Sequence, residues 1–108
     1  MDAHEFENLA EQTLDALFEA LDAAIGGDID VDFDNGLLTL ELDDGRAYIL
    51  NKHAPNQELW LSSPLGGASH YAYDQDAQMW TSTRGEETLY AVLAKELSQI
   101  IGRDVALG

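Results

Sequence analysis

The sequence predicts an α+β protein, a two-layer sandwich with N- and C-terminal helices packed on one face of an antiparallel sheet of about six strands. Apolar residues recur at spacings of three and four near both ends of the chain, which is the periodicity of amphipathic helices. Between these segments, short runs alternate apolar with polar residues and end at turn-forming residues, as in antiparallel hairpins. No linker or repeat interrupts the 108 residues, so we expect a single domain, 1–108, with one modest core.

The first helix is expected over residues 3–25. Its apolar stripe consists of Phe6, Ala10, Leu14, Leu17, Leu21 and Ile25. Gly26 and Gly27 follow the stripe and suit the end of a helix, because glycine tolerates the backbone angles found there.

Six strands are expected next. Residues 28–33, 38–42 and 47–51 alternate apolar with polar side chains and are separated by turn signals at 34–36 and 43–45. The stretch 51–74 supplies the fourth and fifth strands around a Gly66-Gly67 turn, and 79–82 supplies a short sixth. These short connections imply antiparallel hairpins throughout the sheet.

The last element is expected to open at Thr83, with Glu86 and Glu87 at the positive end of a helix dipole. Its apolar stripe consists of Leu89, Val92, Leu93, Leu97 and Ile100. Gly102 is expected to end this helix.

Charge narrows the classes of function. The chain has 21 acidic and 5 basic residues, a formal net charge of -16, and residues 1–45 contain no Lys or Arg. Such a surface repels nucleic acid and anionic membranes and attracts cations and basic protein surfaces. The chain has no cysteine, no apolar run of membrane-spanning length and no basic, apolar leader, so we expect a cytoplasmic protein.

A concentrated set of carboxylates is the first candidate site. Its members are Glu11, Asp15, Glu19 and Asp22 on one face of the first helix, and Asp28, Asp30 and Asp32 around the first strand. A solvated acidic face is the ordinary interpretation, but no basic residue in the first 45 is available to pair with these acids. Exposed carboxylates suit hard cations such as iron, manganese, magnesium or calcium, bound weakly and in a salt-sensitive way.

An EF-hand calcium loop is a less favoured interpretation of the same region. Asp30, Asp32, Asp34 and Glu41 have the required spacing, but Asn35 replaces the glycine that the loop needs. The flanking residues also predict strands rather than helices.

An aromatic residue on a polar strand face is the second candidate site. Leu59 and Leu61 alternate with Trp60, so the two leucines face the core and the indole faces away from it. The candidate partner-binding residues on this side are Asn51, Gln57, Glu58, Trp60, Ser62 and His70. An ordinary solvated sheet face remains the alternative. The three histidines are scattered along the chain without metal-ligand spacing.

Several short motifs together resemble the central signature of the frataxin family, including its bacterial CyaY form. They are Asn51-Lys52, Pro55-Asn56-Gln57, Trp60-Leu61-Ser62-Ser63-Pro64, and Gly67 followed by Tyr71. The resemblance extends over nearly the whole chain and implies the same two-layer fold. It also implies that the acids of the first helix and first strand bind iron. Phe18 and Ala23 depart from the bacterial pattern, which often has acids there.

The resemblance implies an iron-binding protein that modulates iron–sulfur cluster assembly, with weakly bound Fe2+ or Fe3+ and possible other divalent cations. The implied partners are the cysteine desulfurase and the iron–sulfur scaffold protein, with Asn51 and Trp60 on the contacting surface. His70 stands where many mitochondrial members have Arg. We expect a monomer that can oligomerise with iron. Two alternatives stay open: a ferroxidase or iron-storage enzyme that uses the acids, and an acidic mimic of nucleic acid.

Overall fold

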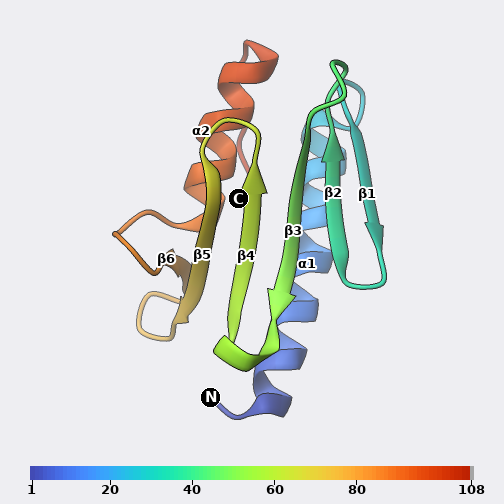
Figure 1. Cartoon of the computed structure of the whole chain (residues 1–108). Helices are drawn as coiled ribbons and strands as arrows, with labels where there is room; N and C mark the ends of the chain where they lie inside the picture. Colours follow the sequence, from blue (N-terminus) through green and yellow to red (C-terminus); the bar gives the residue numbers. More distant parts are fainter. Residues whose placement is uncertain (108) are drawn as a thin grey trace.

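Two helices cover one face of a six-stranded antiparallel sheet in the computed structural model, which describes residues 1–107 (Figure 1). The elements in chain order are α1 (Ala3–Ile25), β1 (Asp30–Asp34), β2 (Leu37–Glu41), β3 (Ala47–His53), the 3-10 turn η1 (Ala54–Asn56), β4 (Glu58–Ser63), β5 (Gly67–Asp74), β6 (Met79–Ser82) and α2 (Leu89–Ile101). The strands lie in the sheet in the order of the sequence. The predicted fold class and strand number are therefore confirmed.

Helix α1 forms where the periodicity places it. The side chain of Asp2 caps the helix by accepting a hydrogen bond from the backbone N–H of Glu5 at 2.8 Å. All six residues of the predicted stripe are at most 1% exposed. The helix ends at Gly26 as predicted, but glycine is needed there for space and not for a left-handed backbone. The φ of Gly26 is -59°, and a Cβ there would lie 2.4 Å from the carbonyl oxygen of Asp22.

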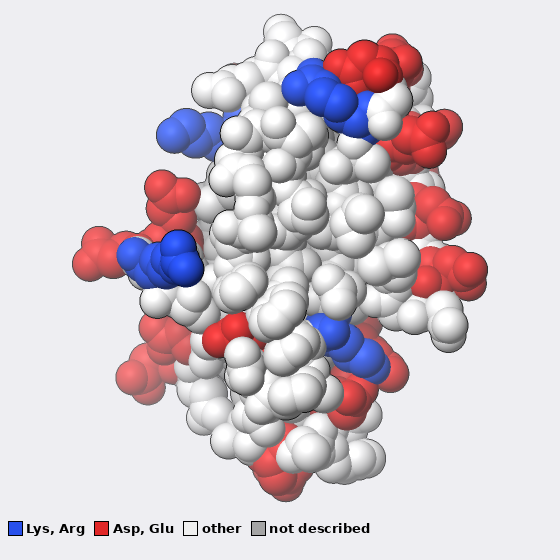
Figure 2. Space-filling view, in the orientation of Figure 1, with Lys and Arg blue, Asp and Glu red and all other residues white. Residues whose placement is uncertain are grey.

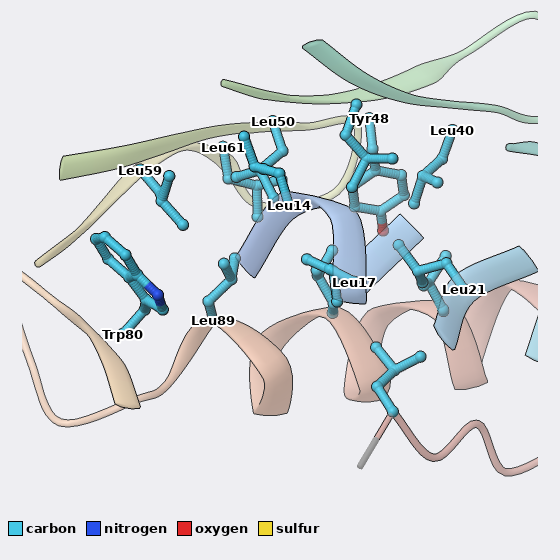
Figure 3. Close-up of a cluster of buried hydrophobic side chains, with 14 of the residues drawn as sticks. Leu14, Leu17, Leu21, Leu40, Tyr48, Leu50, Leu59, Leu61, Trp80 and Leu89 are labelled. Carbon is cyan, nitrogen blue, oxygen red and sulfur yellow. The ribbon is translucent and has the colours of Figure 1, made fainter. Parts of the chain in front are cut away.

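The strands bury alternate residues beneath the helices. Leu40, Leu50, Leu59 and Leu61 are each at most 2% exposed and point toward α1 and α2 (Figure 3), and Leu38 is equally buried. The β1–β2 hairpin turns at Asn35 and Gly36, whose φ angles of 55° and 79° match the type I′ turn that such a pair favours. This alternation directs Trp60 to the opposite side, where no helix covers the sheet.

Helix α2 begins later than the sequence predicts. Thr88 is its cap, and its hydroxyl accepts from the N–H of Ala91 at 3.2 Å. Glu86 and Glu87 therefore precede the helix, and the carbonyl of Glu87 accepts instead from the N–H of Ser82. The helix ends at Gly102, with a left-handed φ of 84°, as expected for this position.

The last residues return to the core, which the periodicity does not predict. Val105 and Leu107 are 7% and 6% exposed, and the N–H of Val105 donates to Ser98 Oγ at 2.9 Å. Within residues 1–107, neither helix combines the length and the apolar character that crossing a bilayer requires.

Candidate functional site

Four exposed acids of α1 follow one line along the helix. Glu11, Asp15, Glu19 and Asp22 are spaced by four, four and three residues, and we call this line the acidic ridge. Phe18 of the same helix packs on Phe33 of β1, with ring centroids 5.9 Å apart. Since Asp15 and Asp22 flank Phe18 by one turn on either side, the ridge runs along the margin where α1 meets the edge strand β1.

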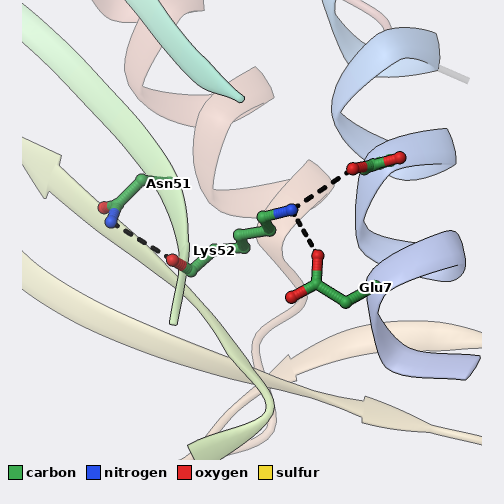
Figure 4. Close-up of polar contacts among 4 residues, drawn as sticks. Glu7, Asn51 and Lys52 are labelled. Carbon is green, nitrogen blue, oxygen red and sulfur yellow. Dashed lines mark hydrogen bonds and ion pairs between the residues drawn. The ribbon is translucent and has the colours of Figure 1, made fainter. Parts of the chain in front are cut away.

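A lysine from β3 neutralises one end of the acidic ridge. The ammonium of Lys52 forms an ion pair with Glu7 and a second with Glu11 Oε1 at 3.3 Å (Figure 4). The hydrogen bond to Glu7, and then that to Glu11, raise the pKa of Lys52 above its usual range. Glu11 is therefore less available to a metal ion than the other three acids of the ridge.

An arginine from the C-terminal segment forms an ion pair with the acid that follows the end of α1. The guanidinium of Arg103 donates to Asp28 Oδ2 at 2.6 Å and to the carbonyl of Ala24 at 2.9 Å. The latter bond satisfies a carbonyl in the last turn of the helix. The expectation that the acids lack basic partners is therefore wrong for Glu11 and Asp28.

The acids of β1 face away from the helix layer. Asp30 pairs in register with Glu41 of β2, and Asp32 pairs with Thr39. The intervening Val31 points to the core side, so the aspartates lie on the open face of the sheet. Asp30 and Glu41 stand opposite each other in a hairpin, which excludes the EF-hand loop.

The acids of α1 and β1 thus approach one edge of the molecule from two sides. Figure 2 shows carboxylates along the margin on the β1 side, while the centre of the sheet is almost free of charge. No three His, Asp or Glu side chains within residues 1–107 converge as a metal cage would require. This arrangement offers hard oxygen ligands singly or in pairs, which suits weak binding of several cations.

The open face of the sheet is the second surface. Its side chains between the margins are mostly uncharged: Leu37, Thr39, Ile49, Asn51, Trp60, Ser62, Ala68, His70 and Ala72. Leu37 and Ile49 are 42% and 40% exposed, so this face presents aliphatic side chains to solvent. Asn51, Trp60 and His70 lie side by side on three neighbouring strands, as the predicted partner surface requires. Gln57 lies at the turn before β4, with a left-handed φ of 53°.

Two imidazoles enclose the indole of Trp60. The His53 ring stacks on it with a centroid distance of 3.7 Å and an interplanar angle of 9°, and the His70 ring stacks on the other side at 4.3 Å and 13°. The indole N–H donates to Glu58 Oε1 at 2.9 Å. His70 Nδ1 lies 3.8 Å from the same carboxylate oxygen.

His53 is the site residue that the sequence interpretation missed. The prediction that the histidines are scattered is wrong for His53 and His70, because antiparallel pairing brings both to Trp60. A signal was present in the sequence. His53 follows Asn51 by two residues, so strand alternation places both on one face if β3 extends past residue 51.

Comparison with known proteins identifies close relatives. The family model for the frataxin-like domain matches residues 1–103. The chain is 42% identical over 101 residues to the iron–sulfur cluster assembly protein CyaY of Thioalkalivibrio sulfidiphilus, covering 91% of this chain and 92% of the relative. It is 39% identical over 105 residues to the mitochondrial frataxin homolog of Schizosaccharomyces pombe, covering 94% of this chain. The chain spans only 66% of the length of that mitochondrial relative.

Solved structures show the same architecture. A frataxin from Psychromonas ingrahamii superposes with a TM-score of 0.87 at 27% identity, covering 100% of this chain and 99% of that one. Trimeric frataxin from the yeast Saccharomyces cerevisiae, complexed with ferrous iron, superposes with a TM-score of 0.70 at 32% identity. That match covers 92% of this chain and 87% of the yeast chain.

Proposed function

The chain belongs to the frataxin family, and from this membership we propose that it binds iron and serves iron–sulfur cluster assembly. In this proposal the protein acts as an iron donor or sensor and regulates the cysteine desulfurase–scaffold complex. Two relatives support the two halves of the proposal. One is named an iron–sulfur cluster assembly protein, and a yeast relative of known structure is complexed with ferrous iron.

The observation that carries the proposal is the meeting of two different surfaces at one side of the molecule. Carboxylates line the margin where α1 meets β1, and the mostly uncharged open face of the sheet begins beside them (Figure 2). Trp60 lies on this face. A partner with a basic patch next to an apolar contact area can engage both surfaces at once.

Iron is the cargo in this proposal, and the predicted ligands differ in whether a basic side chain already pairs with them. Asp15, Glu19 and Asp22 are exposed, and none of them forms an ion pair within the described residues. We therefore propose these three as the main contacts for iron. Glu11 and Asp28 contribute less because each must first release a basic partner, while Asp30 and Asp32 offer a separate group on the sheet side.

The sheet face is proposed as the surface that contacts the desulfurase–scaffold complex. Its contact residues are Asn51, Gln57, Glu58, Trp60, Ser62 and His70. Large aromatics with a polar handle, held in a fixed orientation, are enriched among the residues that contribute most to binding. Trp60 has this character because stacked rings and Glu58 restrain it.

A pull-down from native bacterial extract, with and without added Fe2+, tests the proposal. The expected result is retention of the cysteine desulfurase. A bait with Asp15→Lys and Asp22→Lys should retain much less, whereas a control bait with Glu86→Lys and Glu87→Lys at the other margin should behave as the original. Equal losses for both baits would mean that overall charge, not the acidic ridge, governs retention.

Iron binding is tested separately by titrating Fe2+ under anaerobic conditions and following backbone amide signals. We expect the largest changes at Asp15, Glu19 and Asp22, and micromolar or weaker affinity, because exposed acids form no cage. Changes centred on the histidines would contradict the site. The ferroxidase or iron-storage activity stays the alternative, and spectroscopy of the bound iron under oxygen separates it from iron binding alone. The cytoplasmic location and the oligomeric state stay predictions.

A further inference from the structure

The three-ring stack holds Trp60 in one orientation. Each face of the indole is in contact with an imidazole, and its N–H is bound to Glu58. An exposed tryptophan side chain would otherwise sample several rotamers and would lose that freedom on binding a partner. The stack therefore prepares Trp60 for docking before the partner arrives.

The two imidazoles differ in their polar surroundings. His53 Nδ1 is buried and has no hydrogen-bond partner in the described structure. His70 has a side chain that is 38% exposed, and its Nδ1 faces Glu58 at 3.8 Å. If the His70 ring is protonated, water can solvate it and the Glu58 carboxylate faces its Nδ1–H.

If the His53 ring is protonated within the stack, its Nδ1–H meets neither water nor a carboxylate. In neutral imidazole one ring nitrogen is an acceptor, and a buried acceptor without a partner is tolerated at moderate cost. When both nitrogens carry protons, Nδ1 of His53 becomes a buried donor without an acceptor next to a full positive charge, which costs considerably more. The protonated ring can lower this cost by leaving the stack for water.

No neighbouring charged group of the described residues forms an ion pair with His53 that would stabilise the protonated ring. Glu58 stands opposite it on β4, but Oε1 of that carboxylate lies against the indole N–H and His70 Nδ1, and His53 forms no ion pair with it within residues 1–107. Lys52 points to the other face of the sheet, toward Glu7 and Glu11 of α1 (Figure 4). The turn η1 that follows His53 contains only Ala54, Pro55 and Asn56, none of which titrates. Across the sheet, β5 presents His70 and Ala72 to this side.

We infer that His53 is a proton-sensitive positioning residue for Trp60. Neutral His53 stacks on the indole and fixes its orientation, and protonated His53 leaves the stack and frees one indole face. Histidine is the side chain whose charge ordinarily changes between about pH 5 and 8, so measurements at the two ends of that range compare the two states. The consequence for partner docking rests on the proposed function, whereas the coupling of His53 to Trp60 belongs to the isolated protein.

The isolated protein is tested first, by following the indole N–H signals of Trp60 and Trp80 by NMR from pH 8 to pH 5. Trp80 is 3% exposed and donates to Thr13, so its signal serves as an internal control for the fold. We expect the Trp60 signal to shift between these pH values as the contact with His53 is lost. His70→Phe, which replaces the other imidazole on the indole by a flat ring without a titrating group, should preserve a shift, and adding His53→Phe to it should remove that shift, whereas His4→Phe, remote on α1, should change nothing. A Trp60 shift that persists in the variant with both His70→Phe and His53→Phe overturns the inference.

Partner affinity is measured next, for the desulfurase–scaffold complex at pH 7.5 and pH 5.5. The original protein should bind about three- to tenfold more weakly at the lower pH, the amount expected when one side chain must be immobilised again. His53→Phe should lose most of this difference relative to the original protein, and His53→Ala should bind weakly at both pH values. An unchanged pH difference in His53→Phe overturns the inference. Absence of partner binding at every pH contradicts the proposed function instead, and the NMR titration then decides the role of His53 alone.

Discussion

The acidic ridge and the sheet face differ in charge and in how firmly their side chains are held. The ridge presents exposed charges on flexible side chains, and no described contact fixes Asp15, Glu19 or Asp22. The sheet face presents few charges, and its central ring is held on both sides and at its N–H. Charge acts over a distance set by the ionic strength, whereas a fixed ring acts only on contact. Under the proposed function, we therefore expect the ridge to attract cations and basic partners and the sheet face to supply the strength of the final contact.

The largest effect should come from Trp60→Ala. Truncating a central aromatic contact typically costs at least about 2 kcal/mol of binding free energy, so affinity for the desulfurase–scaffold complex should fall by more than tenfold. The fold and the affinity for Fe2+ should change little, because Trp60 is not part of the core cluster and lies on β4, away from the acidic ridge. Calorimetric titration and thermal unfolding measure these quantities.

Met79→Ala is a suitable control for that change. Met79 is 49% exposed on the edge strand β6, so its truncation removes a comparable exposed apolar side chain outside the proposed contact. It should leave partner affinity nearly unchanged. Unfolding of Trp60→Ala, or partner affinity equal to that of Met79→Ala, would show that the sheet face is only structural.

An intermediate effect is expected from Asp15→Gln combined with Glu19→Gln. These changes remove repulsion between like charges one turn apart, so the melting temperature should rise by about 2–5 °C. Affinity for Fe2+ should fall several-fold because two of the three unpaired acids of the ridge are lost. Glu86→Gln with Glu87→Gln, at the other margin, should leave iron affinity unchanged. A strong loss of stability in the first variant would identify the acids as structural.

The smallest effect concerns Lys52, which links β3 to Glu7 and to Glu11 of the acidic ridge. Lys52→Met should lower the free energy of unfolding at pH 7 by about 0.5–1 kcal/mol, the upper range for partly exposed ion pairs. It should also raise affinity for Fe2+ slightly by releasing Glu7 and Glu11. Lys95→Met, on the exposed side of α2, is the matched control and should change neither quantity.

The pH dependence of the Lys52 contribution has a defined sign. The folded state raises the pKa of Lys52, so its stabilisation is fully present below the unfolded pKa of about 10.4 and is lost as the pH rises through the higher folded value. Burial of Tyr48, Tyr71 and Tyr90 raises the pKa of each phenol and produces losses in the same alkaline range. The difference in stability between the original protein and Lys52→Met isolates the lysine. A difference that does not shrink above pH 10.5 would contradict the assigned ion pairs.

Local periodicity was sufficient to predict most of the fold. The stripe of α1 and the alternation in β2–β4 depend only on neighbours two to four residues apart, and both agree with the structure. The start of α2 was not predictable from the acids alone, because Thr88 forms the cap that decides it.

The candidate site was predicted less completely because its decisive contacts join distant parts of the chain. Lys52 meets Glu7 across 45 positions, and Arg103 meets Asp28 across 75. The stack on Trp60 depends on the register of three strands, which places His53 diagonally and His70 directly beside it. Composition and spacing gave the residue types on each surface, but pairing between distant segments decides which of them are free.

The most direct test of the division of labour is partner affinity measured at about 0.05 M and 0.5 M salt for the original protein, Asp22→Lys and Trp60→Ala. The Debye length is about 10 Å at 0.1 M and shortens further as salt rises, so long-range attraction to Asp22 should be screened at the higher concentration. We predict that Asp22→Lys weakens binding at low salt but differs from the original protein by less than about twofold at high salt. Trp60→Ala should remain more than tenfold weaker at both concentrations. A Trp60→Ala defect that disappears at high salt, or an Asp22→Lys defect that persists there unchanged, would contradict the account.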